Sequence, residues 1–402
     1  MGHNFQYDLC IVGGAGHVGL PLGVVFADSG VKTVLLDINQ GALKKIMGGE
    51  FPFIEKNGNT VLQSALAKKM LFASDSSEVI SKSKFVVIIV GTPVDEFLNP
   101  DFRGITKLFD ESISHFREGQ VLILRSTVFP GTTEKIQKYF KKKNIKAKVT
   151  FCPERIAEGY AVEELRALPQ LVSAYDDEGL REVTELFRKI SPKEPIAMKP
   201  IEAELAKLFI NSWRYIKFAV ANQFFMIAQN NGLNFHIIQK AMSKDYPRDH
   251  DLPAAGFAAG PCLFKDTMQL SAFTHNHFLI GNAAMLVNEG LVNHVVHELK
   301  REFPDSLSEK TVAILGMAFK PELDDPRSSL SYKLRKMLLM ECDVVLCTDE
   351  FIKDPAFVPL EVALRDSDIV ILATPHKKYQ EIDPRKHPNK KFVDVWNFWK
   401  LS

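Results

Sequence analysis

The feature that most constrains this chain is a glycine-rich turn between an apolar strand and an apolar helix. Tyr7 to Val12 has the pattern of a buried strand, Gly14-x-Gly16-x-x-Gly19 follows it, and an apolar helix continues to about Asp28. Val31 to Leu36 predicts a second strand, and Asp37 stands at its end, 18 positions after the last of these glycines. A strand, a helix and a strand in this order form a βαβ unit, which builds parallel sheets. The N-terminal part is therefore predicted to be a doubly wound α/β domain.

The same turn has the composition of a dinucleotide-binding loop. Gly14 permits a tight turn, Gly16 lets backbone N–H groups approach a pyrophosphate, and Gly19 lets the helix pack close to the sheet. His17 and Val18 lie between these glycines, where the helix N-terminus carries partial positive charge. Asp37 would accept the ribose hydroxyls and repel a 2′-phosphate, so NAD is favoured over NADP. The alternative is a tight turn that binds no ligand.

Length, charge and cysteine content narrow the function classes. The chain has 402 residues, 46% of them hydrophobic, which suffices for two or three domains with buried cores. Its 50 basic and 49 acidic residues give a net charge of +1, which argues against a nucleic-acid partner. No apolar run approaches the ~20 residues that span a bilayer, so no membrane partner is expected. Five cysteines and a start without a secretory signal favour reduced thiols and a cytoplasmic location.

Further strands and a change of pattern near Pro200 divide the chain. Strand-like runs at Phe85 to Val90, Val121 to Leu124 and Lys148 to Cys152 extend the first α/β domain over residues 1–199. Long apolar helices are then predicted from Ile201 to about Asn230 and from about Thr267 to Phe303. Residues 200–304 are therefore predicted to form a helical domain.

Strand patterns return after the helical region and predict a smaller α/β domain over residues 305–402. They lie at Thr311 to Leu315, Val344 to Cys347, Ile369 to Ala373 and Phe392 to Val395. One of them echoes the first domain, because the run that ends at Thr374-Pro375 resembles the run that ends at Thr92-Pro93. Open α/β sheets bind ligands at the carboxyl ends of their strands, where both Thr-Pro pairs are expected.

Four polar residues break the apolar pattern of the helix that begins near Ile201. Glu204, Lys207, Asn211 and Arg214 follow one another at spacings of 3, 4 and 3, which places them on one helix face. Such a stripe faces either solvent or an active site, and the segment alone favours neither. In an active site, Lys207 and Asn211 would bind an oxyanion through an ammonium group and an amide N–H.

One cysteine differs from the others in its surroundings. Cys262 follows the Gly- and Pro-containing segment 256–261 and precedes a predicted helix, with Lys265 three residues on. A helix N-terminus and a nearby cation both favour the thiolate, which is the nucleophilic form. The alternative, a buried small hydrophobic residue, is equally consistent with the local sequence.

The histidine pairs do not predict a metal site. His275-x-His277 and His294-x-x-His297 lie in predicted helical stretches, without cysteine or acidic partners at the spacing of zinc ligands. No metal is therefore expected.

Taken together, the motifs resemble one family, the UDP-glucose/GDP-mannose dehydrogenases, over essentially the whole chain. Besides the glycine turn with Asp37 and the helix with Glu204, Lys207 and Asn211, the matching segments occur in family order. They are Gly49-Glu50-Phe51-Pro52-Phe53-Ile54-Glu55, Thr92-Pro93, Ser126-Thr127-Val128-Phe129-Pro130-Gly131-Thr132-Thr133, Pro153-Glu154-Arg155, Gly260-x-Cys262-x-x-Lys265-Asp266, Gly316-Met317-Ala318-Phe319-Lys320 and Asp324-Asp325-x-Arg327-x-Ser329.

The resemblance implies a fold and an activity. The implied fold is α/β, with an N-terminal Rossmann NAD domain, a central long-helix domain that dimerises, and a C-terminal Rossmann-like UDP-binding domain. The implied activity is a four-electron oxidation at C6 of a UDP-sugar with two NAD, which serves polysaccharide biosynthesis. An aldehyde intermediate cannot donate the second hydride directly, so the Cys262 thiolate would add to it and form a thiohemiacetal and then a thioester.

The resemblance also implies residue roles. Lys207 and Asn211 would stabilise the tetrahedral oxyanions, Glu154 would act as general base or acid, and Thr127 and Asp266 would position water. The implied cofactor contacts add Thr92, Thr127, Glu154 and Lys265 to the glycine turn and Asp37. The implied substrate contacts are Glu154, Arg155, Lys207, Asn211, Gly260, Phe319, Lys320 and Arg327, with Lys265 a further candidate for the diphosphate or sugar and Arg248 reaching into the neighbouring subunit of a homodimer.

The chain departs from the family pattern near the nucleophile. Ala258, Ala259 and Pro261 partly replace glycines, Phe264 stands where proline is frequent, and Trp396 stands where arginine is often found. Arg155 resembles members that act on UDP-N-acetylhexosamines, whereas Glu158-Gly159 also occurs in glucose-type members. The identity of the sugar therefore stays open.

Two other functions compete with this interpretation. A two-electron dehydrogenase of the β-hydroxyacid or 6-phosphogluconate type would share the first domain and a Lys/Asn helix, but would need neither Cys262 nor a third domain. A non-catalytic nucleotide-sugar-binding protein would keep the folds without needing Lys207, Asn211 and Cys262 together.

Overall fold

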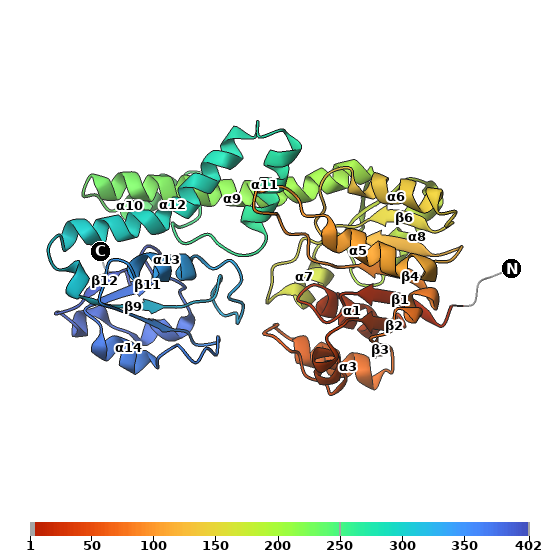
Figure 1. Cartoon of the computed structure of the whole chain (residues 1–402), viewed down its shortest axis with the longest axis horizontal. Coiled ribbons are helices and arrows are strands. Elements are labelled where there is room, and N and C mark those ends of the chain that lie inside the picture. The colour runs from red at the N-terminus through yellow and green to blue at the C-terminus, as the bar shows by residue number, and fades with distance from the viewer. Residues whose placement is uncertain (1–4, 249–250, 401–402) are drawn as a thin grey trace. The chain divides into compact units, whose positions relative to one another are not determined.

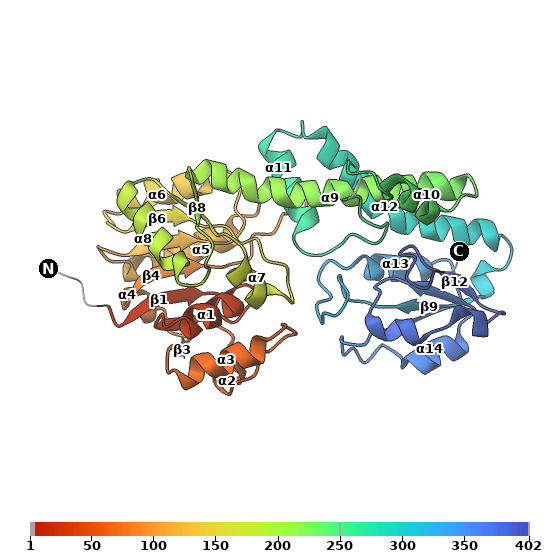
Figure 2. The ribbon, with the colours of Figure 1, turned by 180° about the vertical axis from the view of Figure 1, so that it is seen from behind.

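The computed structural model describes residues 5–248 and 251–400, which form an α/β protein (Figures 1 and 2). The chain divides into two compact units, Met1–Ile210 and Asn211–Ser402. Helix α9 (Pro200–Asn230) runs through the boundary between them. The predicted fold class is confirmed by the two parallel sheets and the long helices between them in sequence. The predicted domain limits at 199/200 and 304/305 stay a prediction.

The first unit is built on an eight-stranded sheet in the order β3-β2-β1-β4-β5-β6-β7-β8. Neighbouring strands are parallel except β6 and β7, which pair antiparallel. The strands are β1 (Tyr7–Val12), β2 (Thr33–Leu36), β3 (Leu71–Ser74), β4 (Ser83–Ile88), β5 (Val121–Leu124), β6 (Lys148–Phe151), β7 (Leu171–Ala174) and β8 (Ile196–Met198). The helices are α1 (Gly19–Asp28), α2 (Gln40–Met47), α3 (Gly58–Ala67), α4 (Glu78–Ser81), α5 (Arg103–Ser112), α6 (Thr132–Lys142), α7 (Ala161–Ala167) and α8 (Asp177–Arg188).

Both faces of this sheet are buried, as the near-continuous apolar strands predict. Leu9 and Ile11 belong to one core cluster with α1, α2, α3, α7 and α8. Cys10 and Val12 point to the opposite face and belong to a second cluster with α4, α5 and α6. This double cover leaves the carboxyl ends of the strands as the edge where loops present side chains.

The second unit combines long helices with a four-stranded parallel sheet in the order β10-β9-β11-β12. Its elements, after the C-terminal part of α9, are α10 (Phe235–Ser243), α11 (Leu263–Phe273), α12 (Leu279–Glu302), β9 (Thr311–Leu315), α13 (Leu330–Leu338), β10 (Val344–Thr348), α14 (Leu360–Asp366), β11 (Ile369–Leu372) and β12 (Lys391–Val393). One core cluster joins residues of α9, α12 and α13 to one face of this sheet. Short 3₁₀ helices lie at Ile113–His115, Leu307–Glu309, Lys377–Glu381 and Pro384–Lys386.

The predicted helical stretch from Thr267 to Phe303 is wrong as a continuous helix. It is interrupted between α11 and α12, where His275 and Asn276 have φ of +52° and +64°. The backbone N–H of Asn276 returns to the carbonyl of Ser271, which closes α11 with a left-handed cap. Asparagine tolerates this conformation better than most residues, and no glycine or proline announces the break.

Strands β3, β7 and β8 were not predicted. They have three or four residues each, and β8 lies at the sheet edge with Ile196 44% exposed. Such short segments carry too few apolar positions for a periodic signal.

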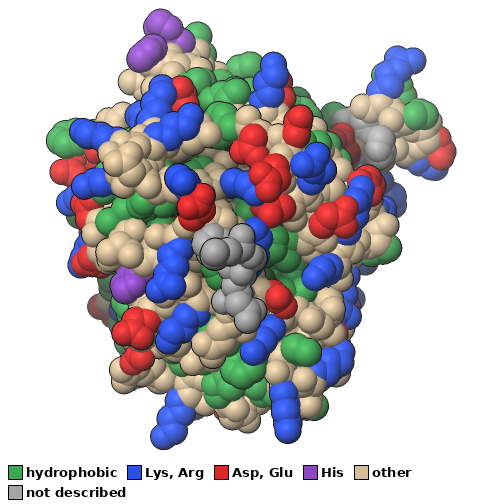
Figure 3. All heavy atoms as spheres, turned by 90° about the vertical axis from the view of Figure 1, so that its right-hand side faces the viewer, with side chains coloured by type: hydrophobic (Ala, Val, Ile, Leu, Met, Phe, Trp, Pro, Cys, Tyr) green, Lys and Arg blue, Asp and Glu red, His purple; other side chains and the backbone are tan. Residues whose placement is uncertain are grey.

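The one face of the molecule drawn as spheres agrees with the charge balance of the sequence. On the face shown in Figure 3, basic and acidic side chains are interspersed, and neither sign gathers into one patch. Among the described residues, no helix combines the length and the apolar character that crossing a membrane requires.

Candidate active site

The predicted site residues fall into two groups, one in each unit. The first group surrounds the glycine turn between β1 and α1. Gly13 has a φ of +80°, and a Cβ on it would lie 1.9 Å from the carbonyl oxygen of Ile89. A Cβ on Gly19 would lie 2.2 Å from the carbonyl oxygen of Gly13, whereas one on Gly16 would meet nothing closer than 3.6 Å. Gly13 and Gly19 are thus needed for the turn itself, and Gly16 leaves open space over it.

The start of α1 and the end of β2 complete a site that suits a dinucleotide. Val18 stands at the N-cap position of α1 and provides no side-chain hydrogen bond. The N–H of Leu20 goes to the carbonyl of Gly16 and Pro21 has no N–H, so at this turn it is the positive end of the helix dipole that suits a pyrophosphate. Asp37 follows β2, and its carboxylate accepts the N–H groups of Ala15 at 2.9 Å and Asn39 at 3.0 Å. These bonds place an anionic acceptor beside the turn, where a ribose would meet it.

His17 contacts Glu158, a residue to which the sequence assigned no role in this site. Its ring stacks on Phe53, with 4.0 Å between ring centroids. Its Nδ1 lies 2.9 Å from Oε1 of Glu158, which comes from the loop after β6. Glu158 follows a strand end in the segment that begins with Glu154, and this position is the signal that could have pointed to it.

The loops after β4 and β5 are tied together beside the predicted cofactor site. The Thr92 hydroxyl donates to the carbonyl of Thr127 at 2.5 Å. The Ser126 hydroxyl donates to the carbonyl of Val90 and accepts its N–H, both at 2.8 Å. The structure therefore brings Thr92 and Thr127 together at the carboxyl edge of the sheet.

Glu154 lies after β6 and is almost fully buried. One of its oxygens accepts the guanidinium of Arg125, a residue that follows β5 and is itself buried. The other oxygen accepts the N–H groups of Arg155 at 2.6 Å and Ile156 at 3.0 Å. Both oxygens of the Glu154 carboxyl group are therefore held in place, one by Arg125 and the other by two backbone N–H groups. Arg125 was missed in the sequence, although it too directly follows a strand.

Arg155, a predicted substrate contact, is partly withdrawn into the protein. Its guanidinium donates to the carbonyl of Pro169. Burial lowers the pKa of Arg155, and the nearby charge of Glu154 opposes that shift. The side chain therefore has a structural partner in addition to any role toward a substrate.

The start of α9 carries Glu204 and Lys207, and both are buried. Glu204 accepts the N–H groups of Gly131 at 2.6 Å and Thr133 at 2.8 Å, which caps the N-terminus of α6. Burial raises the pKa of Glu204, although these bonds oppose the shift. Lys207 lies one turn further along the helix and is 8% exposed. The polar stripe of α9 is thus not a solvated face at these two positions.

In the second unit, Cys262 is the exposed cysteine among the five of the chain. It occupies the N-cap position of α11, with φ and ψ of −108° and −51°. Cys10, Cys152 and Cys347 are buried, and Cys342 is partly buried. Burial raises the pKa of Cys152 to about 12 and that of Cys342 to about 11, so these thiols are held protonated. Position in the fold therefore distinguishes Cys262 as the thiol that meets solvent.

Asp266 links this cysteine segment to α9. It is fully buried, and its carboxylate accepts the amide of Asn211 at 2.5 Å and the ammonium of Lys265 at 2.6 Å. Three predicted site residues therefore form one hydrogen-bonded cluster one turn after Cys262.

The loop after β9 carries the predicted substrate contacts Phe319, Lys320 and Arg327, and Phe319 lies against a further one, Gly260, which precedes α11. Gly260 has a φ of +106°, and a Cβ on it would lie 2.6 Å from the ring of Phe319. Lys320 follows in the same loop and is partly buried. Arg327 bonds through Nε and Nη2 to the buried carboxylate of Asp325, whose orienting role was not predicted. These two parallel hydrogen bonds fix the plane of the Arg327 guanidinium group.

Arg248 lies apart from these contacts. It is exposed, and its Nη1 lies 3.2 Å from the hydroxyl of Tyr246. Nothing in the described chain brings it to another predicted site residue.

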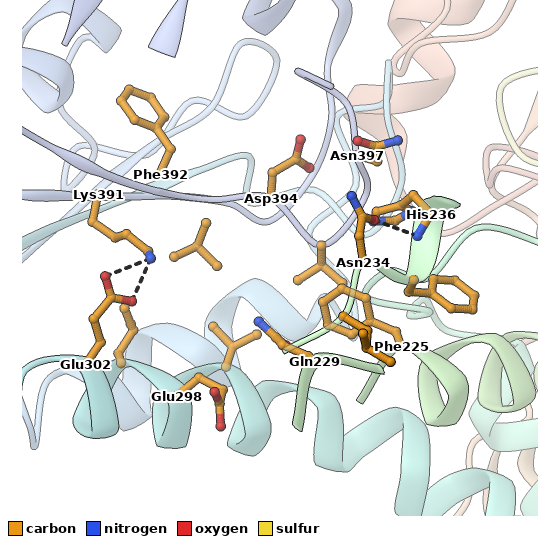
Figure 4. Close-up of a pocket in the computed structure, with 16 residues that line it drawn as sticks. Phe225, Gln229, Asn234, His236, Glu298, Glu302, Lys391, Phe392, Asp394 and Asn397 are labelled. Carbon is orange, nitrogen blue, oxygen red and sulfur yellow. Dashed lines mark hydrogen bonds and ion pairs between the residues drawn. The ribbon is translucent and has the colours of Figure 1, made fainter. Parts of the chain in front are cut away.

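A separate pocket of about 310 Å³ in the second unit contains none of the predicted site residues (Figure 4). It is lined by the end of α9, by α10, by α12 and by the chain around β12, with Lys391 paired to Glu302 at its margin.

Comparison with known proteins covers nearly the whole chain. The NAD binding domain of the UDP-glucose/GDP-mannose dehydrogenase family matches residues 8–191, its central domain 201–290 and its UDP binding domain 313–401. A UDP-N-acetyl-D-mannosamine dehydrogenase of Methanocaldococcus jannaschii is 27% identical over 401 residues, which is 97% of this chain and 92% of that protein. A similar dehydrogenase of Campylobacter jejuni is 25% identical over 95% of this chain and 98% of its own length.

A solved structure supports the same fold. The UDP-D-ManNAc dehydrogenase of Pyrococcus horikoshii superimposes with a TM-score of 0.91 at 24% identity, covering 98% of this chain and 96% of its own.

The glycine turn, Asp37 and the matched NAD domain define this protein as an NAD-dependent oxidoreductase. The three matched domains identify it further: the chain belongs to the UDP-glucose/GDP-mannose dehydrogenase family.

Proposed function

We propose that the protein oxidises the C6 hydroxymethyl group of a UDP-N-acetylhexosamine to a carboxylate in two NAD-dependent steps. The observation that carries this proposal is the exposed Cys262 at the N-cap of α11, directly before the cluster of Asp266, Asn211 and Lys265. A two-electron dehydrogenase has no use for a nucleophile at this position.

The first oxidation needs groups that hold the alcohol as its charge changes. When bound, NAD supplies the hydride acceptor for both oxidations. The alcohol loses its proton and C6 loses a hydride, which leaves an aldehyde. Lys207 and Asn211, four residues apart on α9, stabilise the negative oxygen that develops at C6. Asp266 fixes the orientation of the Asn211 amide through the bond at 2.5 Å.

The second oxidation needs Cys262. Its thiolate adds to the aldehyde carbon and forms a sulfur–carbon bond, and the former carbonyl oxygen becomes the oxyanion of a thiohemiacetal. Loss of a second hydride from C6 gives a thioester. Water then attacks the thioester carbon, the carbon–sulfur bond breaks, and the products are a carboxylate and the free thiol. The Glu154 carboxylate, which Arg125 and two backbone N–H groups orient, is the group we assign to activate that water.

The substrate class rests on the relatives and on one local feature. The relatives from M. jannaschii and C. jejuni are named for UDP-N-acetyl-D-mannosamine. Arg155 after Pro153-Glu154 agrees with the N-acetylhexosamine type. UDP-N-acetylmannosamine is therefore the first substrate to test.

We further propose that the protein acts as a homodimer. On α9, the exposed side chains of Trp213, Val220, Phe224 and Ile227 follow one another at spacings of 7, 4 and 3, which aligns them in one apolar stripe. An apolar stripe of this length on a long helix is typical of a surface that a second helix covers. Light scattering should give twice the 45.2 kDa mass of the chain, and Trp213→Glu should shift it toward the monomer.

Product stoichiometry tests the proposed reaction. With UDP-N-acetylmannosamine as substrate, each sugar consumed should yield two NADH, and mass spectrometry should detect the uronic acid. One NADH per sugar would favour a two-electron dehydrogenase, and binding without NADH would favour a nucleotide-sugar-binding protein. UDP-GlcNAc, UDP-GalNAc and UDP-glucose, assayed in parallel, decide the sugar.

Substitution of the nucleophile tests the mechanism. Cys262→Ser should lower acid formation by at least about 10³-fold, because the thiohemiacetal no longer forms. Cys342→Ser is the matched control, since it removes a partly buried thiol outside the predicted site. Normal acid formation by Cys262→Ser would remove Cys262 from the mechanism.

A further inference from the structure

Besides Asn211, helix α9 carries a buried amide that neither the motifs nor the proposed reaction uses. Asn222 is fully buried and lies 11 residues after Asn211, which is close to three helical turns. Asn211 and Asn222 therefore lie on the same face of α9, about 16 Å apart along the axis.

The Asn222 side chain binds the loop that leads to Cys262. Its Nδ2 donates to the carbonyl of Gly256 at 3.0 Å, and its Oδ1 accepts the N–H of the same residue at 2.8 Å. One amide thus pairs with both polar groups of one residue, as a neighbouring strand would do. Among the standard side chains, only asparagine and glutamine offer a donor and an acceptor side by side for this.

A second buried amide holds Asn222 in this orientation. The other hydrogen of Nδ2 goes to Oδ1 of Asn288 on α12 at 2.9 Å, and Asn288 in turn donates to the carbonyl of Tyr215 at 3.0 Å. Asn288 is also fully buried. The network fixes which way the Asn222 amide points, because a flipped amide would place two donors or two acceptors face to face.

Apart from the Asn222 anchor, the loop has close contacts at two points, Gly256 and Gly260. A Cβ on Gly256 would lie 2.2 Å from the ring of Trp396, so an aromatic ring lies directly against the backbone there. Further along, Phe319 contacts Gly260, and the N–H of Gly260 reaches the carbonyl of Ser328 at 3.3 Å. The backbone between these contacts has no strand or helix partners of its own.

Cys262 is therefore attached to α9 on both sides. Four residues after it, Asp266 binds Asn211 at 2.5 Å. Six residues before it, Gly256 binds Asn222. We infer that Asn222 is a positioning residue of the nucleophile: it sets where the Cys262 sulfur stands relative to the Asn211 amide. This inference rests on the proposed function, because it assigns a purpose to the position of that sulfur.

The inference predicts an effect on one half of the reaction. The first hydride transfer does not involve Cys262, whereas thiohemiacetal formation requires its sulfur within bonding reach of the aldehyde. A loosened loop should therefore slow the second oxidation by about 10-fold or more and leave the first within about twofold. In single-turnover experiments, Asn222→Leu should separate NADH formation into two phases, and the aldehyde should become trappable by a hydrazide.

A matched variant separates positioning from loss of stability. Gln120 is also a fully buried amide with three hydrogen bonds to backbone groups, those of Arg117, Ile80 and Ser83, but it lies at the amino end of β5. Asn222→Leu and Gln120→Leu should both lower the melting temperature, because each leaves buried polar groups without partners. Only Asn222→Leu should change the ratio of the two phases. Asn222→Ser, which keeps one hydroxyl, serves if the leucine variant does not fold.

Hydrogen exchange keeps this test independent of the substrate. In the protein without substrate, amides of residues 254–262 should exchange at least about 10-fold faster in the Asn222 variant than in wild type and in Gln120→Leu. Unchanged exchange in this segment, or an unchanged ratio of the two phases, overturns the inference. If wild type oxidises no UDP-sugar, the proposed function fails, and the exchange experiment still decides whether Asn222 fixes the loop.

Discussion

The two sheets of this protein start from the same local plan. In each, a strand ends at a glycine with a left-handed backbone: Gly13 after β1 has a φ of +80°, and Gly316 after β9 has +89°. Both glycines donate to the carbonyl that ends the next strand, Leu36 or Thr348, at 2.9 Å. An aspartate then follows that strand and accepts N–H groups from the glycine loop.

The two aspartates differ in what they leave for a ligand. Asp37 is partly exposed and accepts one N–H from the loop, that of Ala15. The Asp349 side chain is fully buried. Its carboxylate accepts the backbone N–H of Met317 at 2.6 Å, that of Ala318 at 3.0 Å and two further backbone N–H groups. His376 lies 3.2 Å from the same carboxylate.

The difference shows how one plan serves two purposes. After Gly13, the helix α1 begins at Gly19, so a helix N-terminus and an accessible carboxylate lie beside one turn. After Gly316, the helix α13 begins only at Leu330, and the intervening loop carries Phe319 and Lys320. In the first sheet the aspartate suits a ribose, whereas in the second it fixes the shape of a loop that presents other residues.

The largest effect should come from the feature that the two sheets share. A Cβ on Gly13 would lie 1.9 Å from the oxygen of Ile89, and one on Gly316 would lie 2.4 Å from the oxygen of Thr374. Each contact involves backbone, which cannot move aside. Gly13→Ala and Gly316→Ala should each destabilise the protein by about 4 kcal/mol or more, seen as loss of folded protein or a large fall in melting temperature.

Gly16 is the control for that prediction. A Cβ there meets only the oxygen of Gly13, at 3.6 Å. Gly16→Ala should therefore keep the melting temperature and weaken NAD binding, because the methyl group occupies the approach to the turn. Equal destabilisation by all three substitutions would contradict the steric argument.

The second prediction separates the two aspartates by stability. Asp349→Asn replaces one acceptor oxygen by a donor group that faces backbone N–H groups, so it should cost about 2–4 kcal/mol of unfolding free energy. Asp37→Asn, at a partly exposed position, should cost less than about 1 kcal/mol. Chemical denaturation of the two variants measures both values, and similar losses would show that Asp349 is not the more constrained residue.

The sequence predicted the strand, glycine turn and aspartate of the first sheet better than it predicted how the surroundings of Asp37 and Asp349 differ. The strand, the glycine turn and Asp37 were recognisable because each has a local signature in consecutive residues. The burial of the Asp349 side chain was not recognisable, since it depends on His376, 27 positions away, and on a loop of irregular structure. For the same reason, the motifs located Cys262 and Asp266, whereas Arg125, Glu158 and the Asn222 anchor act through partners that are distant in sequence.

The third prediction concerns the cofactor. Asp37→Asn should lower kcat/KM for NAD by about 10-fold, because a ribose hydroxyl loses a charged acceptor worth about 1.5 kcal/mol. The preference for NAD over NADP should shrink, since the repulsion of a 2′-phosphate is removed. Steady-state rates with both cofactors test this, and Asp75→Asn, an exposed acid at the end of β3, is the control. A preference of the wild type for NADP would overturn the reading of Asp37.

The smallest predicted effect is a pH dependence with opposite signs in the two units. Burial raises the pKa of Glu55 in the first unit from 4.5 to about 7, although the N–H of Val162 opposes the shift. Burial would also raise the pKa of Asp349, but the hydrogen bond and charge of His376 and the backbone N–H groups hold it below its usual range.

The sign of each contribution follows from proton binding. Between pH 4.5 and about 7, folded Glu55 keeps a proton that the unfolded chain has lost, so stability falls as pH rises through this window. Glu55→Gln should therefore melt about 2 °C above wild type at pH 8 and close to wild type at pH 5, after allowance for solvent screening. The ionised Asp349 carboxylate stabilises the folded protein above its unfolded pKa, and this stabilisation is lost as pH falls through its folded pKa. The loss of melting temperature in Asp349→Asn should therefore become smaller in acid. A Glu55→Gln advantage that is the same at pH 5 and pH 8 would show that the carboxyl does not titrate in this range.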